Sequence, residues 1–119
     1  MEKILHDTSS LIENYKLNIK EIKAFTTILN VIEFPKALEI SKLEVLYPTH
    51  SDYKLAIKLA ISLLKIGKPI PAVDIIIAAI ALNNKLTLRT KDKHFLVIKD
   101  IKPEFKVEIV KWTIGNLFM

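Results

Sequence analysis

Four carboxylates are the side chains of this sequence best suited to chemistry, because each stands beside an apolar segment that must pack centrally. They are Asp7, Glu33, Asp74 and Asp92. Carboxylates gathered at one point repel one another, and a divalent cation relieves that repulsion. Magnesium and manganese prefer hard oxygen ligands, retain several waters and often bind carboxylates together with substrate phosphates. Together these acids predict metal-assisted hydrolysis of a phosphodiester bond.

Each of these carboxylates also has an ordinary structural explanation when it is taken alone. Asp7 and Asp74 would serve as helix caps. Glu33 would be an exposed helical glutamate, and Asp92 would be a turn aspartate whose side chain binds nearby backbone amides. Only their joint placement at one end of a sheet favours a catalytic site.

The remaining reactive residue types point away from other enzyme classes. The chain has no cysteine, which excludes disulfides, thiolate nucleophiles and cysteine-bound zinc. Its three histidines lack the spacing of a zinc site, and no Ser/His/Asp order indicates acyl transfer. Ser9 and Thr90 are candidates to orient a carboxylate or a metal-bound water. Their ordinary alternatives are a helix-cap hydroxyl and a strand-end hydroxyl.

The elements that must position these residues alternate between strands and helices. Short apolar runs predict strands over residues 3–6, 24–27, 44–47 and 86–90. Weaker alternation over 97–101 and again over 105–109 predicts an edge strand. Asp7 and Asp92 then fall just past the carboxyl ends of two strands, where open α/β sheets place their active crevice.

Helical spacing fills the segments between these strands. A helix is expected after Asp7, and a second from about Ile28, with Glu33 on it and Pro35 in its first turns or at a kink. A third follows Ser51 as N-cap and ends at Gly67. Its apolar residues recur on one face: Tyr53, Ala56, Ile57, Ala60, Ile61 and Leu64. The run 75–82 is apolar on every side, which is typical of a helix buried between layers.

This alternation predicts an α/β sandwich around a mostly parallel sheet, with residues 1–119 forming one domain. Two domains would each bury too little apolar surface. The N-terminus has no signal-peptide pattern, and the apolar run 75–82 is far shorter than the roughly 20 residues that span a membrane. We therefore expect a cytoplasmic protein with no membrane partner.

One block of the sequence resembles a known family, the PIN domains, and especially the VapC-type toxins of bacterial and archaeal toxin–antitoxin pairs. The block has a Gly67-Lys-Pro turn, an aspartate, Asp74, opening an apolar alanine-rich helix, and a strand ending in Thr90-Lys-Asp92 with Phe95 shortly after. The family shows these features in the same order.

Two shorter matches extend the resemblance over nearly the whole chain. Asp7-Thr-Ser9 is similar to the opening aspartate of the family, and residues 27–34 are similar to its second acidic element, which places Glu33 in the metal-binding position. Three features depart from the family pattern. His6 replaces an aliphatic residue, which predicts a more exposed strand or a local partner for the ring. The stretch between Asp7 and Glu33 is short, and His94 stands where an acid or asparagine is common.

The resemblance implies a PIN-like three-layer α/β/α sandwich and a magnesium- or manganese-dependent endoribonuclease that leaves a 5′-phosphate. Asp7, Glu33, Asp74 and Asp92 would hold the metal directly or through water. A homodimer and a VapB-type antitoxin partner are further implications. Two alternatives stay open: a catalytically silent PIN-like module that binds RNA or a partner, and an RNA-processing PIN nuclease outside toxin–antitoxin systems.

Basic residues near the acids are candidates to guide the RNA backbone. Lys and Arg number 18 against 13 Asp and Glu, so the net charge is +5 and favours anionic partners. The candidates for RNA contact are Lys68, Arg89, Lys91, Lys93 and His94. Such residues contribute salt-dependent affinity rather than sequence choice. Each is equally well explained as a solvated surface residue, and the apolar tail 112–119 would contribute to an interface or pack on its own domain.

Overall fold

A five-stranded parallel sheet forms the centre of the computed structural model, which describes residues 2–110. The strand order is β3-β2-β1-β4-β5, and all neighbouring strands pair in parallel. The strands are β1 (Ile4–His6), β2 (Phe25–Thr27), β3 (Glu44–Leu46), β4 (Thr87–Thr90) and β5 (Val107–Ile109). The mostly parallel α/β sheet expected from the sequence is therefore confirmed. The apolar tail 112–119 lies outside the described residues.

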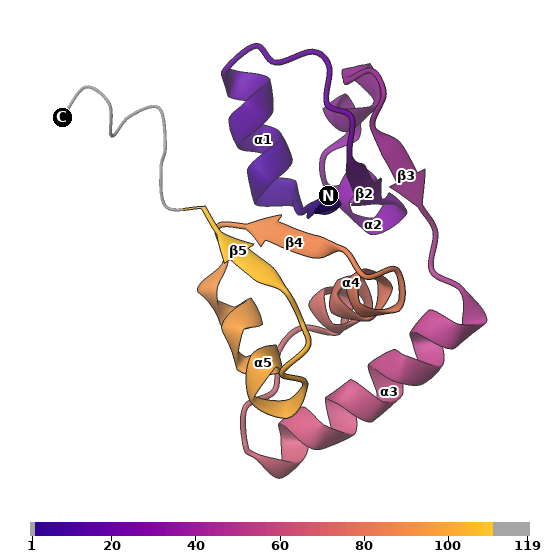
Figure 1. The fold of residues 1–119 in the computed structure, drawn as a ribbon, viewed down its shortest axis with the longest axis vertical. Coiled ribbons are helices and arrows are strands. Elements are labelled where there is room, and N and C mark those ends of the chain that lie inside the picture. Colours follow the sequence, from indigo (N-terminus) through magenta and orange to yellow (C-terminus); the bar gives the residue numbers. More distant parts are fainter. Residues whose placement is uncertain (1, 111–119) are drawn as a thin grey trace, which may run out of the picture.

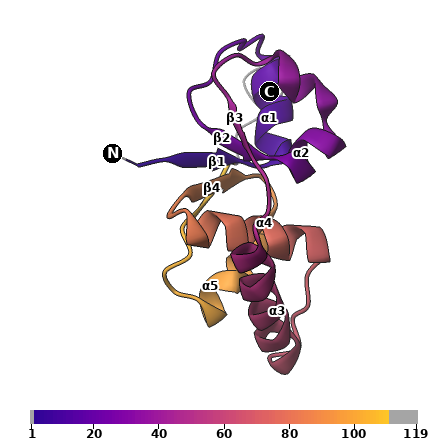
Figure 2. The same ribbon diagram turned by 90° about the vertical axis from the view of Figure 1, so that its right-hand side faces the viewer.

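Helices cover both faces of the sheet, which gives three layers (Figures 1 and 2). One face carries α1 (Thr8–Lys16), α2 (Ile28–Glu33) and the short 3₁₀ helix η1 (Pro35–Glu39). The other face carries α3 (His50–Lys65), α4 (Ala72–Asn83), the 3₁₀ helix η2 (Lys93–Val97) and α5 (Ile98–Ile101). In Figure 2, α4 lies next to the sheet and α3 lies outside α4. None of the helices within residues 2–110 is long and apolar enough to cross a membrane.

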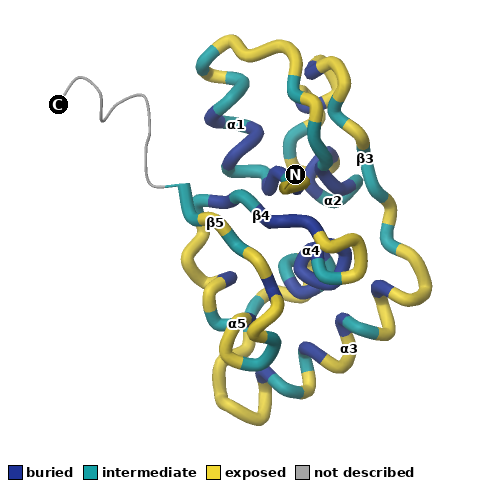
Figure 3. The backbone as a smooth tube through the Cα atoms, in the orientation of Figure 1, coloured by how far each residue is buried: buried dark blue, intermediate teal, exposed yellow. Residues whose placement is uncertain are grey.

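The helix α4 is the centre of the larger of two hydrophobic cores, as the apolar run 75–82 predicts. Its residues Ile77 to Ala81 are all fully buried, and they pack beneath Leu5 of β1 and Leu88 of β4. Figure 3 shows this buried stretch between sheet and α3. A smaller core on the other face contains Leu11 and Val31. The two cores hold α1, α2 and α4 against the sheet, and these three helices bear on the candidate site.

Three local expectations are corrected by the structure. Residues 97–101 belong to η2 and α5 instead of an edge strand, because the buried side chains Phe95 and Ile98 recur at helical spacing. The edge strand β5 is limited to Val107–Ile109. Thr49, not Ser51, is the N-cap of α3: its hydroxyl accepts from the backbone of Asp52, whose carboxylate accepts from the backbone of Thr49.

Pro35 stands at a break between two short helices. The helix α2 ends at Glu33, and Phe34 has a non-helical backbone with φ −142° and ψ 79° before Pro35 opens η1. A residue before proline is disfavoured in the helical region, so the break is expected from the proline itself. As a consequence Glu33 is the last residue of its helix, next to solvent.

The apolar face expected on α3 is divided in the structure. The side of α3 that packs on α4 presents Ala56, Leu59 and Leu63, which are all buried. Of the six residues expected on one face, only Ala56 is buried there. Ala60 is half-buried, and the others are exposed, so most of the expected face is not the side that packs: Tyr53, Ile57, Ile61 and Leu64. The helix has apolar residues around more than half of its circumference, and one neighbour can cover only one side.

Candidate active site

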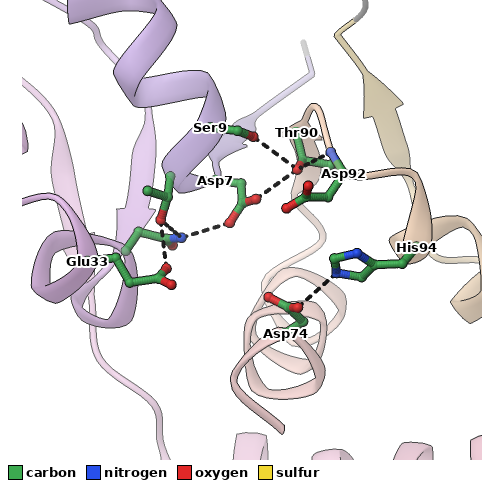
Figure 4. Close-up of polar contacts among 9 residues, drawn as sticks. Asp7, Ser9, Glu33, Asp74, Thr90, Asp92 and His94 are labelled. Atoms are coloured by element: carbon green, nitrogen blue, oxygen red, sulfur yellow. Dashed lines mark hydrogen bonds and ion pairs between the residues drawn. The ribbon is translucent and has the colours of Figure 1, made fainter. Parts of the chain in front are cut away.

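Two of the acids stand at carboxyl ends of central strands, and two stand at helix ends beside them. Asp7 directly follows β1, and Asp92 is the second residue after the end of β4. Asp74 lies in the first turn of α4, and Glu33 ends α2. Figure 4 shows the side chains at the same edge of the sheet, around a common space. The fold thus brings together all four acids selected from the sequence.

Asp7 is the buried member of this group, with 4% of its surface exposed. It is the N-cap residue of α1, but its side chain makes no capping hydrogen bond. Its carboxylate instead accepts from Asn30 Nδ2 (2.8 Å) and from Thr90 Oγ1 (2.7 Å). Burial raises the pKa of Asp7, and these hydrogen bonds oppose that rise. The charge of Asp74 raises the pKa of Asp7 further.

Asn30 and Thr8 connect Asp7 to Glu33. The Asn30 amide, which is fully buried, donates from Nδ2 to Asp7 and to Thr8 Oγ1 (3.0 Å). Thr8 Oγ1 in turn donates to Glu33 Oε1 (2.7 Å). The Asn30 Oδ1 atom accepts from Thr27, the N-cap of α2, and this contact fixes the orientation of the amide. A buried carboxylate and an exposed one are therefore held by one chain of hydrogen bonds.

Sequence reasoning did not select Asn30 or Thr8. The available signal was the spacing of Thr27 and Asn30, which is that of a capping box, and the position of Asn30 one helical turn before Glu33. Neither feature reveals that the free end of the amide reaches Asp7, because that contact spans 23 residues of sequence.

Thr90 and Ser9 form a second set of contacts to the same carboxylate. Thr90 Oγ1 uses its single hydrogen to donate to Asp7, so it accepts from Ser9 Oγ (3.3 Å) and from the backbone of Asp92 (3.1 Å). Ser9 Oγ also accepts from the backbone of Lys91 (2.9 Å). Thr90 therefore touches a carboxylate directly, whereas Ser9 acts on Thr90 and on the loop that carries Asp92.

Asp74 is paired with His94. The Nε2 atom of His94 lies 2.8 Å from Asp74 Oδ2, and the imidazole stacks on the buried ring of Phe95 at a centroid distance of 4.9 Å. The N-cap of α4 is Pro71, so Asp74 is not a helix cap. Burial raises the pKa of Asp74, His94 lowers it, and the charges of Asp92 and Glu33 raise it. His94 thus contacts a carboxylate directly. The sequence had suggested only an RNA contact or a solvated surface residue at this position.

The donor set fits a hydrated divalent cation. The site offers carboxylate oxygens, which are the hard ligands that magnesium and manganese prefer. Within residues 2–110, no three histidine or acidic side chains lie closely enough to hold an ion together. Magnesium commonly keeps several waters and takes only one or two protein carboxylates. The arrangement therefore fits an ion bound directly by one or two acids and through water by the others.

Most of the candidates for RNA contact are already paired with acids. Lys68 Nζ lies 3.8 Å from Asp100 Oδ2, and Arg89 Nη2 lies 3.0 Å from Glu108 Oε2. Lys91 Nζ lies 3.2 Å from Oε2 of the buried Glu13. Within residues 2–110, only Lys93 of the five candidates forms no ion pair. The pairs of Lys68 and Arg89 are exposed and therefore weak, so a polyanion can displace them, whereas the pair of Lys91 with the buried Glu13 is less accessible.

His6, the departure at the first strand, is buried and has a local partner. Its Nδ1 atom lies 2.7 Å from Ser10 Oγ, one helical turn along α1. Burial lowers the pKa of His6 to about 4, and the charge of Arg89 adds to this effect. Of the two sequence-based interpretations, the local partner is confirmed and the exposed strand is wrong. At neutral pH the ring is uncharged and takes no part in the acidic cluster.

Comparison with known proteins assigns the fold. No family model and no curated protein matches the sequence. Several solved structures match over most of their length. A chain of DNA-bound VapBC from Salmonella typhimurium is 21% identical, with 92% of this chain and 98% of that chain covered and a TM-score of 0.70. A chain of VapBC-5 from Mycobacterium tuberculosis, a member of the VapBC family of toxin–antitoxin systems, is 20% identical, with 92% and 98% covered and a TM-score of 0.69.

A third match agrees with these two. A chain of VapBC-1 from nontypeable Haemophilus influenzae is 21% identical, with 89% of this chain and 96% of that chain covered and a TM-score of 0.70. At this level of identity the likeness concerns the fold. The PIN-like α/β fold expected from the resemblance is therefore confirmed.

Proposed function

We propose that this chain is a metal-dependent endoribonuclease and the toxin of a type II toxin–antitoxin pair. The observation that carries the proposal is the buried carboxylate of Asp7, which faces Asp74, Asp92 and Glu33 at the carboxyl edge of the sheet. None of the ion pairs within residues 2–110 involves Asp7. Burying a carboxylate without a cation lowers the stability of the folded state. Such an unpaired group therefore indicates a functional role rather than a structural one.

In such a site some residues would bind the metal and others would orient the metal-binding carboxylates. Asp7, Asp74, Asp92 and Glu33 would hold magnesium or manganese, directly or through water. When bound, the cation supplies the Lewis acidity that activates a water molecule and offsets negative charge on the phosphate. Asn30 and Thr90 keep Asp7 in one orientation, since each donates to a different oxygen of its carboxylate. Thr8 does the same for Glu33, so the spacing of donors is set before substrate arrives.

The proposed partners follow from the fold and the charge of the chain. RNA is the proposed substrate, and Lys93 and the paired cations near the acids would contact its backbone. A VapB-type antitoxin is the proposed protein partner, because the matched folds come from VapBC complexes. The site of action would be the cytoplasm. The resemblance also implies a homodimer, although no feature of the acidic site requires one.

The test compares wild type with Asp74→Asn on labelled RNA, in magnesium, in manganese and in chelator. We expect wild type to cleave in either metal and not in chelator, with 5′-phosphate at the new ends, and Asp74→Asn to be inactive. Asp100→Asn is the matched control, because Asp100 is an exposed aspartate on α5 whose partner is Lys68. It should cleave as wild type does, and thermal unfolding should show that all three proteins are folded.

The outcomes separate the competing functions. Equal cleavage by wild type and Asp74→Asn, or cleavage that chelator does not affect, contradicts the proposed chemistry. Binding of RNA without cleavage by either protein favours the catalytically silent module. A neighbouring open reading frame for a small DNA-binding protein that copurifies with this chain and stops cleavage supports the toxin, whereas its absence favours an RNA-processing nuclease.

A further inference from the structure

A lysine stands just before each of the five strands. It is the residue directly before β1 and β5, and the second residue before β2, β3 and β4. All neighbouring strands are parallel, so these lysines share the amino edge of the sheet, opposite the edge that carries the acids. In Figure 2, β1 runs away from this edge, which lies on the side marked N. We call these residues the lysine row, and in the order of the strands across the sheet they are Lys42, Lys23, Lys3, Lys85 and Lys106.

The length of the lysine row suits a chain of phosphates. Neighbouring strands lie about 4.8 Å apart, so five strands spread the lysines over about 19 Å. A stacked nucleic-acid strand has a phosphate about every 3.4 Å along its axis, and about six nucleotides therefore match the row. A single small anion would use only part of it.

Most of the lysine row is free of ion pairs. All five lysines are exposed. Within residues 2–110, only Lys42 among them is paired with an acid: its Nζ atom lies 3.3 Å from Glu21 Oε2. This contrasts with the cations near the acidic site, of which most are paired. The other four lysines of the row can neutralise phosphates without first giving up a partner.

Three glutamates lie among these lysines: Glu2, Glu44 and Glu104. Glu104 Oε2 lies 3.5 Å from the Nζ atom of Lys102, which is outside the row. Glu2 accepts a hydrogen bond from Thr87 Oγ1 (2.9 Å) but forms no ion pair, and neither does Glu44. Two acids without a cationic partner thus stand beside four such lysines, and the edge keeps an excess of positive charge that attracts anions.

Two lysines of the row occupy backbone positions at which glycine is favoured. Lys42 has φ 66° and Lys85 has φ 54°, both in the left-handed region. A side chain is unfavourable there, and the chain uses a glycine, Gly67, for the same conformation elsewhere (φ 69°). Local backbone geometry therefore does not explain a lysine at either position, and a role for the ammonium group does.

Two hollows lie between the lysines of the row. One has a volume of about 510 Å³ and is lined by Lys3, Lys85 and Lys106. The other has a volume of about 470 Å³ and is lined by Lys3, Lys23 and Lys42. Lys3 belongs to both, so the two hollows adjoin along the edge. Each offers three lysines to a phosphate that enters it.

The surroundings of the lysine row favour a nucleic acid over a protein as its partner. Protein interfaces depend on a few large apolar or aromatic anchors that bury well. Within residues 2–110, none of the exposed large apolar side chains lines either hollow. Contacts between lysine and phosphate need charge and no such anchor.

From these features we propose that the lysine row binds the phosphate backbone of RNA at the amino edge of the sheet. Lys3 and Asp7 are four residues apart along β1, which is about 13 Å at about 3.3 Å per residue, so the row is a contact separate from the acids. It contributes affinity and reads no bases. The choice of RNA rests on the proposed function, whereas the contact with phosphate rests on the lysines alone.

The first experiment measures binding of a labelled RNA of 12 or so nucleotides by fluorescence anisotropy in chelator, so that metal-dependent cleavage cannot interfere. The variant Lys3→Gln/Lys23→Gln/Lys85→Gln should bind about tenfold more weakly than wild type, or weaker still. The slope of log affinity against log salt should fall by about 2, because each phosphate contact to a single strand contributes about 0.7. A second RNA of unrelated sequence should show the same loss.

The matched control is Lys54→Gln/Lys58→Gln/Lys65→Gln. It also removes three positive charges from exposed residues, but these residues lie on α3. The control should bind RNA as wild type does and with the same dependence on salt. Circular dichroism should show that both triple variants are folded, since every substituted side chain is exposed.

The second experiment locates the contact on wild type by acetylation of lysines, read residue by residue with mass spectrometry. Addition of RNA in chelator should slow acetylation of the row, including Lys3, Lys23 and Lys85. Acetylation of the α3 lysines used in the control should not change. Polyglutamate at the same charge concentration should protect the row less than RNA does.

Several results would overturn the proposal. These are equal RNA binding by wild type and the row variant, an equal loss in the control, a loss confined to one RNA sequence, and protection confined to lysines beside the acids. Protection by polyglutamate but not by RNA would identify an acidic protein as the occupant and also overturns it. RNA bound through the row by a protein that cleaves no RNA in metal supports this proposal and contradicts the proposed function. Metal-dependent cleavage by a protein whose row variant binds as wild type does has the opposite meaning.

Discussion

Replacing Asn30 with alanine is the sharpest test of how this protein holds a buried carboxylate. The substitution removes the Nδ2 donor from Asp7 and from Thr8, and it removes the Oδ1 acceptor from Thr27. Asn30 is 0% exposed and Asp7 is 4% exposed, so water does not easily replace the lost donor. The stability of α2 and the ionisation of Asp7 are therefore perturbed together.

The expected loss can be worked from the two contacts. A hydrogen bond to a charged group contributes about 1.5–3 kcal/mol, and loss of a helix-cap interaction costs roughly 1 kcal/mol. The sum is about 2.5–4 kcal/mol of unfolding free energy, which is a large part of the 5–15 kcal/mol or so that holds a typical domain together. Urea denaturation at neutral pH in chelator measures this loss.

Asn84→Ala is the matched control for this variant. Asn84 donates from Nδ2 to the backbone oxygen of Ile80 (2.8 Å), so the control loses a hydrogen bond from the same type of side chain without touching a carboxylate. We expect a loss of about 1 kcal/mol, the usual contribution of a neutral hydrogen bond.

The dependence on pH distinguishes an electrostatic role of Asn30 from a packing role. Loss of the donor raises the pKa of Asp7 above its already raised value in the folded protein. A carboxyl group whose folded pKa is raised loses stability as pH increases through that pKa. The difference between wild type and Asn30→Ala should therefore shrink from neutral pH to about pH 4. A difference that is constant over this range, or equal to that of Asn84→Ala at neutral pH, refutes the reasoning.

Four further outcomes are expected. In chelator, wild type should gain stability relative to Asp74→Asn as pH falls from neutral, because the raised pKa of Asp74 makes its ionised form unfavourable in the folded state, and thermal unfolding against pH measures this. Manganese at 100 times its dissociation constant should add about 2.7 kcal/mol to the unfolding free energy of wild type. If the same manganese concentration stabilises Asp74→Asn by a similar amount, Asp74 is not a ligand. His94→Ala should raise the pKa of Asp74, because the hydrogen bond from His94 lowers that pKa in wild type. NMR of the Asp74 carboxyl carbon against pH measures this change, and an identical titration in wild type and variant would contradict the contact. Thr49→Ala should cost roughly 1 kcal/mol in urea unfolding because it removes the cap of α3, whereas Ser51→Ala should cost little.

The carboxylates and the central helix could be predicted from the sequence because their patterns are local. The run 75–82 is apolar on every side, and no arrangement other than burial suits it. Asp7 and Asp92 follow apolar strands, and the carboxyl ends of parallel strands meet at one edge whatever the other details. These constraints require only the order of elements along the chain.

Other features depend on which segments meet in space. The weak alternation over residues 97–101 suggested a strand, but Phe95 and Ile98 are both buried in the core only when the segment is helical. On α3, the sequence predicted one apolar face, but the helix packs on α4 with a different side, which contains Ala56, Leu59 and Leu63. Secondary structure at these points follows tertiary packing.

The amino-acid sequence by itself determined the chemical type of the candidate site: carboxylates without a thiolate, two of them just past the ends of parallel strands. The tertiary structure decided how those acids are held. The contacts of Asn30 with Asp7, Thr90 with Asp7 and His94 with Asp74 span 23, 83 and 20 residues of sequence. No pattern in the sequence predicts hydrogen bonds over such separations, because each depends on where two elements pack and not on the residues between them.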